Sequence, residues 1–368
     1  MKKISSFEYN TLIWFLIRAC FTELTFSTIL YHIKQDAWIS IIIGIILGLI
    51  PLILYEYLKQ KYPDETIISL NNKLWKNFGK ILNFIVFIGS LAIVTCTFWI
   101  LVHFANALFL YKTNLWIISL ALIIPICYAA TKEINIISKI SLMLFYVSIL
   151  FNVLIFIGII GNVDINNVKP IFENNISNIF NCSFMFIGIN IMKLFYLNII
   201  NKNIIKKYSS KQSILLYLIT SVNLLIIAFT TICVFGIDLS TLYEYPAFQI
   251  LKRVNILGIF DRIESILSIE ALFSMFIQIT IIIYYLKETI KETFFTNEKT
   301  DKYIIISICL FIFIISNIIF ITHEAGEKFF TGPLLYLTYI VLFIIPLITF
   351  FKSLNDVKVL KNQEYSSS

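Results

Sequence analysis

The chain has 368 residues, of which 59% are hydrophobic and only 14% are charged. A soluble domain of this length needs more polar surface to cover its core, so the composition excludes a soluble protein and indicates a membrane protein. The formal net charge of +7 does not predict a nucleic-acid partner, because the basic residues gather on one side of the predicted membrane spans.

A helix that crosses a bilayer needs about 20 largely apolar residues. Ten such spans are predicted in chain order, at roughly 9–31, 38–58, 81–109, 114–130, 139–160, 180–200, 213–236, 263–286, 303–321 and 333–351. The fourth is the weakest, because it is short and contains Pro125. An even number of spans places both chain ends on one side of the membrane.

The distribution of basic residues predicts which side that is, because lysine and arginine are retained in the cytoplasm. The side that holds the N-terminus carries 20 of the 29 lysines and arginines, and the opposite side carries 7. We therefore expect both termini in the cytoplasm. Residues 66–80, between the second and third spans, place apolar side chains on one helical face and predict a helix lying on the cytoplasmic surface.

The outer connection at 237–262 is long and amphipathic. Pro246 suits the first turn of a helix, and Gly258 can end it. Ile250, Val254 and Leu257 would share one face, so the segment predicts a short helix lying on the mouth of the bundle. A docked connector without a function is the alternative. The proposed outer lid comprises Tyr245, Pro246, Arg253, Asp261, Arg262 and Glu264.

Ten spans divide into five plus five within a single membrane domain. The first unit would be 1–175, the second 176–351, and 352–368 would form a cytoplasmic tail. An odd number of spans in each unit makes the second insert upside down relative to the first, as in transporters built from inverted repeats.

Catalysis and metal binding are not indicated. The six cysteines lie in or at the edge of apolar runs without C-x-x-C spacing, so they predict neither disulfides nor a metal site. Phosphate-binding loops, metal-ligand spacings and nucleophile motifs are not found in the sequence. We therefore expect no enzyme activity and no cofactor.

Charged residues inside the spans are the chemical signal, because a charge at the bilayer centre costs about 2.5–3.5 kcal/mol or more. The five are Arg18, Glu23, His103, Lys193 and Glu270. Arg18 and Glu23 lie about 140° apart around a helix, so they should find different partners. Arg18 and Lys193 are close enough to span ends to snorkel. His103 is interpreted as a satisfied polar residue rather than a proton relay.

Span one and span six supply the polar groups that would form a site. Glu23 lies in CFTELTFST, whose hydroxyl side chains can satisfy a broken helical turn. Span six contains Gly188, Asn190 and Lys193. If the two units pack face to face, Glu23 and Lys193 can form an ion pair. The alternative is that these charges only hold helices together.

Three segments carry a family resemblance. They are QDAWIS at 35–40, KYPDETI at 61–67, and the run from Tyr245 to Ser265 with its Tyr-Pro, basic residues and acidic-Arg-x-acidic element. In this order and at these separations, the chain resembles the spore germination protein B-subunit family (GerAB-like), a branch of the amino acid, polyamine and organocation transporter superfamily.

The resemblance implies a LeuT-like fold of two inverted five-helix repeats. It implies a germinant receptor subunit in the inner spore membrane that acts with an A subunit and a lipoprotein C subunit. A small nutrient, commonly an amino acid, would bind between broken first and sixth helices. The candidate ligand-binding residues are Cys20, Phe21, Thr22, Glu23, Phe186, Gly188, Asn190 and Glu270. The sequence departs from the family by lacking a Gly-rich break in span one and a carboxylate in span six.

Two other functions fit the same features. One is a secondary active amino acid transporter coupled to protons or cations, with Glu23 and Glu270 as titrating groups. The other is a structural partner that has lost its ligand and only scaffolds a complex.

Overall fold

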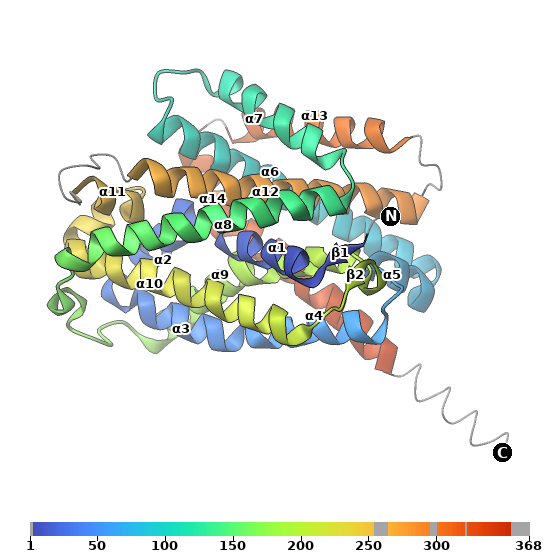
Figure 1. The fold of residues 1–368 in the computed structure, drawn as a ribbon, viewed down its shortest axis with the longest axis horizontal. Helices are drawn as coiled ribbons and strands as arrows, with labels where there is room; N and C mark the ends of the chain where they lie inside the picture. Colours follow the sequence, from blue (N-terminus) through green and yellow to red (C-terminus); the bar gives the residue numbers. More distant parts are fainter. Residues whose placement is uncertain (1–2, 254–263, 295–299, 321, 355–368) are drawn as a thin grey trace, which may run out of the picture.

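The computed structural model describes residues 3–253, 264–294, 300–320 and 322–354. Within them, eight helical stretches are long and apolar enough to cross a membrane. The first stretch, Ser6–Lys61, has 56 residues and turns back near Lys34, so it provides two passages (Figure 1). With the shorter apolar helix Leu115–Ala130, the described residues contain ten passages. The predicted all-α membrane fold with ten spans is confirmed.

The first five passages follow one another along the chain, with short 3-10 or π segments, labelled η, between some of them. The elements are β1 (Ile4–Ser5), α1 (Ser6–Arg18), η1 (Phe21–Thr25), α2 (Phe26–Ile33), η2 (Lys34–Asp36), α3 (Ala37–Leu47), α4 (Leu49–Lys61), α5 (Ile67–Trp75), α6 (Asn77–Leu108), α7 (Leu115–Ala130) and α8 (Ile134–Ile159).

The second five passages include more short segments than the first. The elements are η3 (Ile160–Asn162), η4 (Ile165–Val168), α9 (Ile176–Phe186), η5 (Ile187–Ile191), η6 (Met192–Ile199), η7 (Lys202–Ile204), β2 (Ile205–Lys206), α10 (Ser210–Leu242), α11 (Pro246–Arg253), α12 (Glu264–Phe294), α13 (Asp301–Ile319), α14 (His323–Thr331), α15 (Pro333–Tyr339), η9 (Ile340–Ile344) and a final helical stretch at 345–354.

Several helix ends differ from the predicted ones for local reasons. The surface helix α5 begins with a capping box between Thr66 and Ser69, and it ends at Trp75 because Lys76 has a positive φ of 50°. Helix α10 continues past Gly236, where a φ of 68° kinks it, instead of ending there. Helix α14 was not predicted.

Helix α1 lies at the centre of the bundle. It starts at a capping box in which the Ser5 hydroxyl accepts from the Glu8 amide at 3.1 Å and the Ser5 amide donates to the Glu8 carboxylate at 2.8 Å. Helices α8, α10 and α12 pack around it, while α7 and α13 lie together at one edge of the molecule (Figure 1). Most side chains of α1, Arg18 among them, are therefore buried inside the bundle.

At one end of the bundle, the start of the chain is tied to the segment after span six. Ile4 pairs with Ile205 and Ser5 with Lys206 in a two-stranded parallel sheet. Beside this sheet, the ammonium of Lys59 donates to the backbone oxygens of Leu197 and Ile200 at 3.0 and 2.8 Å. Spans one, two and six are therefore joined at the end of the bundle that holds the N-terminus.

Candidate functional site

Span one is broken in the middle of the bundle. Helix α1 ends at Arg18, Cys20 adopts a left-handed conformation with a φ of 71°, and a π-helical turn, η1, leads into α2. The Cys20 carbonyl accepts from the amides of Leu24 and Thr25 and from the Thr25 hydroxyl. The expected break is therefore present without glycine, and its backbone strain falls on a cysteine.

Span six is irregular beside this break. Helix α9 runs into the π-helical turn η5, and the 3-10 segment η6 follows. The Asn190 amide in η5 donates to the carbonyl oxygens of Ile17 and Ala19 at 2.9 and 3.3 Å. Gln278 of α12 donates to the Leu16 carbonyl at 3.3 Å. Because a helix end leaves carbonyls unpaired, these two side chains hold the broken end of α1 in place.

Glu23 is the buried acidic group of the break. Its side chain is 1% exposed, and the Thr22 hydroxyl donates to Glu23 Oε1 at 2.9 Å. Among the described residues, Glu23 Oε2 has no hydrogen-bond partner, and neither has Asn190 Oδ1. A buried acceptor without a donor is costly, so a ligand that supplied a hydrogen-bond donor to either oxygen would be stabilised at the break.

The predicted ion pair between Glu23 and Lys193 is not formed. Lys193, which is 2% exposed, places its ammonium 3.2 Å from Gln278 Oε1 and 3.5 Å from Cys20 Sγ. The salt bridges within 4.0 Å in the described part of the chain do not include one to Glu23. The reason is that the Lys193 side chain reaches toward α12 and is held there, rather than extending toward η1. It does not snorkel.

Glu270, predicted to bind ligand, belongs to a different cluster. Its carboxylate pairs with Arg18, with 2.9 Å between Nη2 and Oε2, and the two side chains are 5% and 0% exposed. Asn152 donates to Glu270 Oε1 at 2.7 Å, and Ser148 also donates to it. Arg18 further donates to Asn223. Glu270 is therefore paired in this structure, and its predicted role in ligand binding stays a prediction, while Arg18 lies in the interior and does not snorkel.

Phe21, Phe186 and Gly188 serve packing around the break. The Phe21 ring lies edge-on to Phe186, with 5.8 Å between centroids. A Cβ at Gly188 would lie 2.6 Å from Leu335 Cδ1 and 2.9 Å from Tyr339 Cε2. Gly188 therefore allows span six to approach α15 closely.

The predicted outer helix is present as α11, which contacts η1. Tyr245 and Pro246 are buried, and Phe104 of α6 packs on Tyr245 and Phe248 at centroid distances of 5.4 and 4.9 Å. Burial raises the pKa of the Tyr245 hydroxyl, and the neighbouring Glu244 carboxylate raises it further. Arg253 ends α11 and Glu264 begins α12, while Asp261 and Arg262 lie outside the described residues.

An outer cavity of about 590 Å³ lies between α2, the end of α10 and α14. Leu24 and Thr28 line one side, directly after Glu23 in sequence, and Glu244 and His323 line the other. His323 Nε2 lies 2.9 Å from Glu244 Oε1, so this pair joins α14 to the start of the lid. The sequence reading missed this cavity, because α14 was not predicted.

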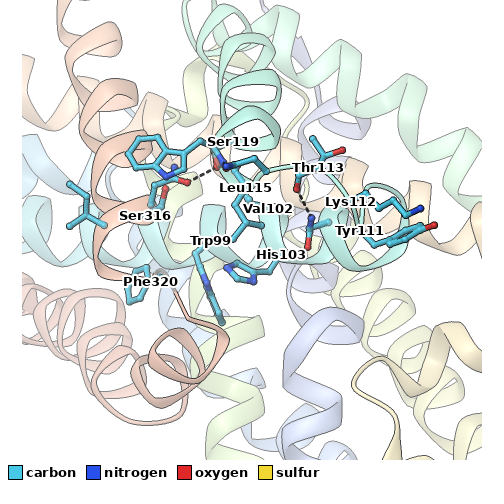
Figure 2. A pocket seen from close by; sticks show the side chains of 15 residues that line it. Trp99, Val102, His103, Tyr111, Lys112, Thr113, Leu115, Ser119, Ser316 and Phe320 are labelled. Carbon is cyan, nitrogen blue, oxygen red and sulfur yellow. Dashed lines mark hydrogen bonds between the residues drawn. The ribbon is translucent and has the colours of Figure 1, made fainter.

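A second cavity of about 580 Å³ lies between α6, α7 and α13 (Figure 2). His103 and Trp99 line it, with 5.1 Å between their ring centroids. His103 also packs against His323, with 5.9 Å between their ring centroids, and its interpretation as a satisfied polar residue stays a prediction. Polar side chains also line this cavity, and among them the Ser119 hydroxyl donates to Asn317 Oδ1 at 3.2 Å.

The neutral polar residues of the site were missed as well. Gln278 contacts span one and Lys193, while Asn152, Asn223 and Ser148 surround the ion pair. Asparagine and glutamine residues inside apolar spans could have indicated these positions. An amide side chain without a hydrogen-bond partner in the membrane is costly, as an unpaired charge is.

Comparison with known proteins places these features in a family. A profile described as "Spore germination protein" matches residues 3–325. In Bacillus subtilis (strain 168), spore germination protein A2 is 25% identical over 331 residues, or 86% of each chain, and spore germination protein KB is 22% identical over 259 residues, or 68% of each. The putative spore germination protein YfkT is 25% identical over 236 residues, so the chain spans 64% of YfkT.

Solved structures give the fold. A manganese transporter of Eremococcus coleocola superposes with a TM-score of 0.62 at 13% identity, covering 93% of this chain and 78% of the transporter. A Na⁺-coupled sialic acid symporter superposes with a TM-score of 0.61 at 14% identity, covering 92% of this chain and 78% of the symporter. The LeuT-like five-plus-five fold is therefore confirmed.

Proposed function

The chain belongs to the spore germination protein family, and from that premise we propose that it is the membrane-embedded B subunit of a nutrient receptor that triggers germination. It would act in the inner spore membrane with an A subunit and a C subunit, with both termini in the cytoplasm. Residues 1–175 and 176–351 would be its two inverted repeats. Family membership and the excess of basic residues on one side of the membrane support this proposal.

The single observation that carries a sensing role is the incompletely satisfied Glu23 carboxylate at the break of span one. A buried carboxylate oxygen without a donor stabilises the bound state of any ligand that supplies one. The outer cavity is lined by Leu24, the residue that follows Glu23 in the chain. Cys20, Thr22, Glu23 and Asn190 would form the polar part of this site.

The lid gives the site a way to signal. Helix α11 contacts both η1 and α12, so closure of α11 over a ligand would change how the broken span packs against the rest of the bundle. The ligand would shift the equilibrium between two arrangements by no more than its difference in affinity for them. The A and C subunits would respond to the changed proportion of the two arrangements.

The proposal is tested in spores. Deletion of the gene, followed by a screen of single nutrients, identifies the nutrient whose response depends on this chain. Spores that carry Glu23→Ala or Asn190→Ala at normal receptor abundance are then expected to lose that response. Glu133→Gln, which alters an exposed carboxylate, is the control and should respond normally. Normal germination of both site variants would refute the proposed site.

A secondary transporter is the second candidate function, and the fold supports it because both structural neighbours described above are transporters. In this case the chain alone, in proteoliposomes, would accumulate a labelled amino acid in response to a proton or cation gradient. Glu23→Gln would abolish uptake. A receptor subunit would show no gradient-driven uptake but would still be required for germination.

A further inference from the structure

The cavity of about 580 Å³ between α6, α7 and α13 has no part in the proposed function. It lies where α7 and α13 form one edge of the molecule (Figures 1 and 2). The outward face of α7 beside it is apolar, with Ile117, Leu120 and Ile124 all exposed. Exposed apolar side chains on a membrane-spanning helix face lipid, so this cavity lies next to the bilayer and not in the middle of the bundle.

Hydrogen bonds hold the rim of the cavity in one shape. Asn106, near the end of α6, donates to the carbonyl oxygens of Leu110 and Thr113 at 2.9 and 3.1 Å. The Thr113 amide donates to the Leu110 carbonyl at 2.9 Å. These bonds fix the turn that carries Tyr111 and Lys112, and Figure 2 shows both side chains at one end of the cavity.

The charge of the lining favours an anion. Lys112 and His103 are its basic residues, and the described residues that line the cavity include no carboxylate. In the described part of the chain, Lys112 makes no ion pair within 4.0 Å. A negative charge at the rim would therefore gain the Lys112 ammonium as a counter-charge without meeting a like charge.

The inner wall carries buried polar groups. Ser119 and Asn317 are 1% and 8% exposed, and both line the cavity with Ser316. The indole Nε1 of Trp99, another lining residue, is buried and has no hydrogen-bond partner among the described residues. A hydrocarbon chain cannot form hydrogen bonds with such groups, whereas the oxygens of a phosphate or a glycerol can. The wall therefore suits a polar group rather than an acyl chain.

Aromatic side chains place the opening of the cavity at the level of lipid headgroups. Trp116 and Tyr111 line it and are 46% and 73% exposed. Exposed tryptophan and tyrosine are enriched where a membrane meets water. Leu120 lies one turn beyond Trp116 on the same face of α7, so polar lining passes directly into apolar surface. A ligand with a polar head and an apolar tail matches this order.

We propose that this cavity binds the headgroup of an anionic phospholipid. The phosphate lies beside Lys112, the glycerol lies toward Ser119, and an acyl chain follows Trp116 and Leu120 along α7. Phospholipids with an ammonium in the headgroup fit less well, because the described lining offers no carboxylate to that cation. This inference does not depend on a nutrient, on the partner subunits or on the site at the break of span one.

The test uses the full-length chain in bilayers that mix phosphatidylglycerol with phosphatidylcholine. One lipid at a time carries brominated acyl chains, which quench the fluorescence of tryptophans that they contact. One lysine near an anionic headgroup contributes about 1 kcal/mol, so we expect an association preference for phosphatidylglycerol of about fivefold. The chain has five tryptophans. Trp116→Phe identifies the reporter, because it should remove this preference from the quenching signal.

Variants separate a cavity from a charged surface. Lys112→Gln should abolish the preference, and Lys112→Arg should keep it. Lys139→Gln, which removes an exposed lysine of α8, is the control and should keep it too. Ser119→Leu fills the inner wall without changing any charge, and it should also abolish the preference. The unfolding temperature in phosphatidylcholine alone shows whether each variant is folded, and Ser119→Val replaces Ser119→Leu if the latter is not.

Three outcomes would overturn the inference. The first is equal association of the two lipids with the parent chain. The second is an unchanged preference in a folded Ser119 variant, which would show that Lys112 attracts anionic lipid without the cavity. The third is loss of the preference when inorganic phosphate is added to the buffer, which would show that the cavity takes a soluble anion. None of these outcomes bears on the receptor role, which germination of the spores tests separately.

Discussion

Arg18 and Glu270 form an ion pair in the interior of the bundle, with 2.9 Å between Nη2 and Oε2. Arg18 is the last residue of α1, so the pair attaches the broken end of span one to α12. Asn152 and Asn223 complete the pair by hydrogen bonds from α8 and α10. Four helices therefore meet at the end of α1.

Removal of one partner of this pair should be strongly destabilising. Glu270→Leu leaves Arg18 buried without a counter-charge, and we expect a loss of about 3–5 kcal/mol. Arg18→Met with Glu270→Leu removes both charges and should recover much of that loss. Unfolding in detergent, measured for both single variants and the double variant, checks this. Additive losses in the double variant would show that the two residues act independently.

The Asn190 amide should stabilise the break itself. Asn190→Ala leaves the Ile17 and Ala19 carbonyls without their side-chain donor, and we expect a loss of about 1–3 kcal/mol. Asn162→Ala, at an exposed position, should be neutral. The measurement is the unfolding midpoint of each variant. If the two variants unfold alike, Asn190 does not support the break.

The left-handed conformation of Cys20 predicts an unusual order of stability. Cys20→Gly and Cys20→Ala both remove the thiol, but only glycine adopts a φ of 71° without strain. We expect the glycine variant to be more stable than the alanine variant by about 1 kcal/mol. Comparison of their unfolding temperatures tests the conformation. The reverse order would argue for a right-handed residue at this position.

Gly188 should matter for packing and not for ligand binding. Gly188→Ala places a methyl group against Leu335 and Tyr339 of α15, and overpacking of this kind costs about 1–3 kcal/mol. We expect a lower unfolding temperature with unchanged affinity for any stabilising nutrient. Thermal unfolding with and without the nutrient separates the two effects. A loss of affinity at unchanged stability would restore Gly188 to the ligand site.

The outer pair of Glu244 and His323 should make stability depend on pH. The hydrogen bond from His323 lowers the pKa of Glu244, so the folded state favours the ionised carboxylate. The stabilisation is present above the unfolded pKa of glutamate, about 4.3, and is lost as the pH falls through the lower folded pKa.

Unfolding of the parent and of Glu244→Gln across this pH range checks the prediction. The difference between them should shrink toward zero in acid. In a His323→Gln background, Glu244→Gln should change little at any pH. A difference that grows in acid would give the linkage the opposite sign.

The spans could be predicted because bilayer thickness imposes a length that hydropathy reveals directly, even for α7 with its Pro125. The position of the break in span one could be predicted only from the family resemblance. Cysteine seldom adopts a positive φ, so Cys20 does not indicate a left-handed conformation in the sequence. The sequence does not predict which buried polar side chains contact one another. Whether Lys193 meets Glu23 or Gln278 depends on how spans six and eight rotate against span one, and periodicity within a single helix does not fix that rotation.

The small parallel sheet between Ile4–Ser5 and Ile205–Lys206 has a mechanical consequence. This ladder fastens spans one and six to each other at one end of the bundle, and Lys59 of α4 ties span two to the end of η6 beside it. Under the proposed function, a movement of span one caused by a ligand at the break would therefore be passed to span six through this ladder.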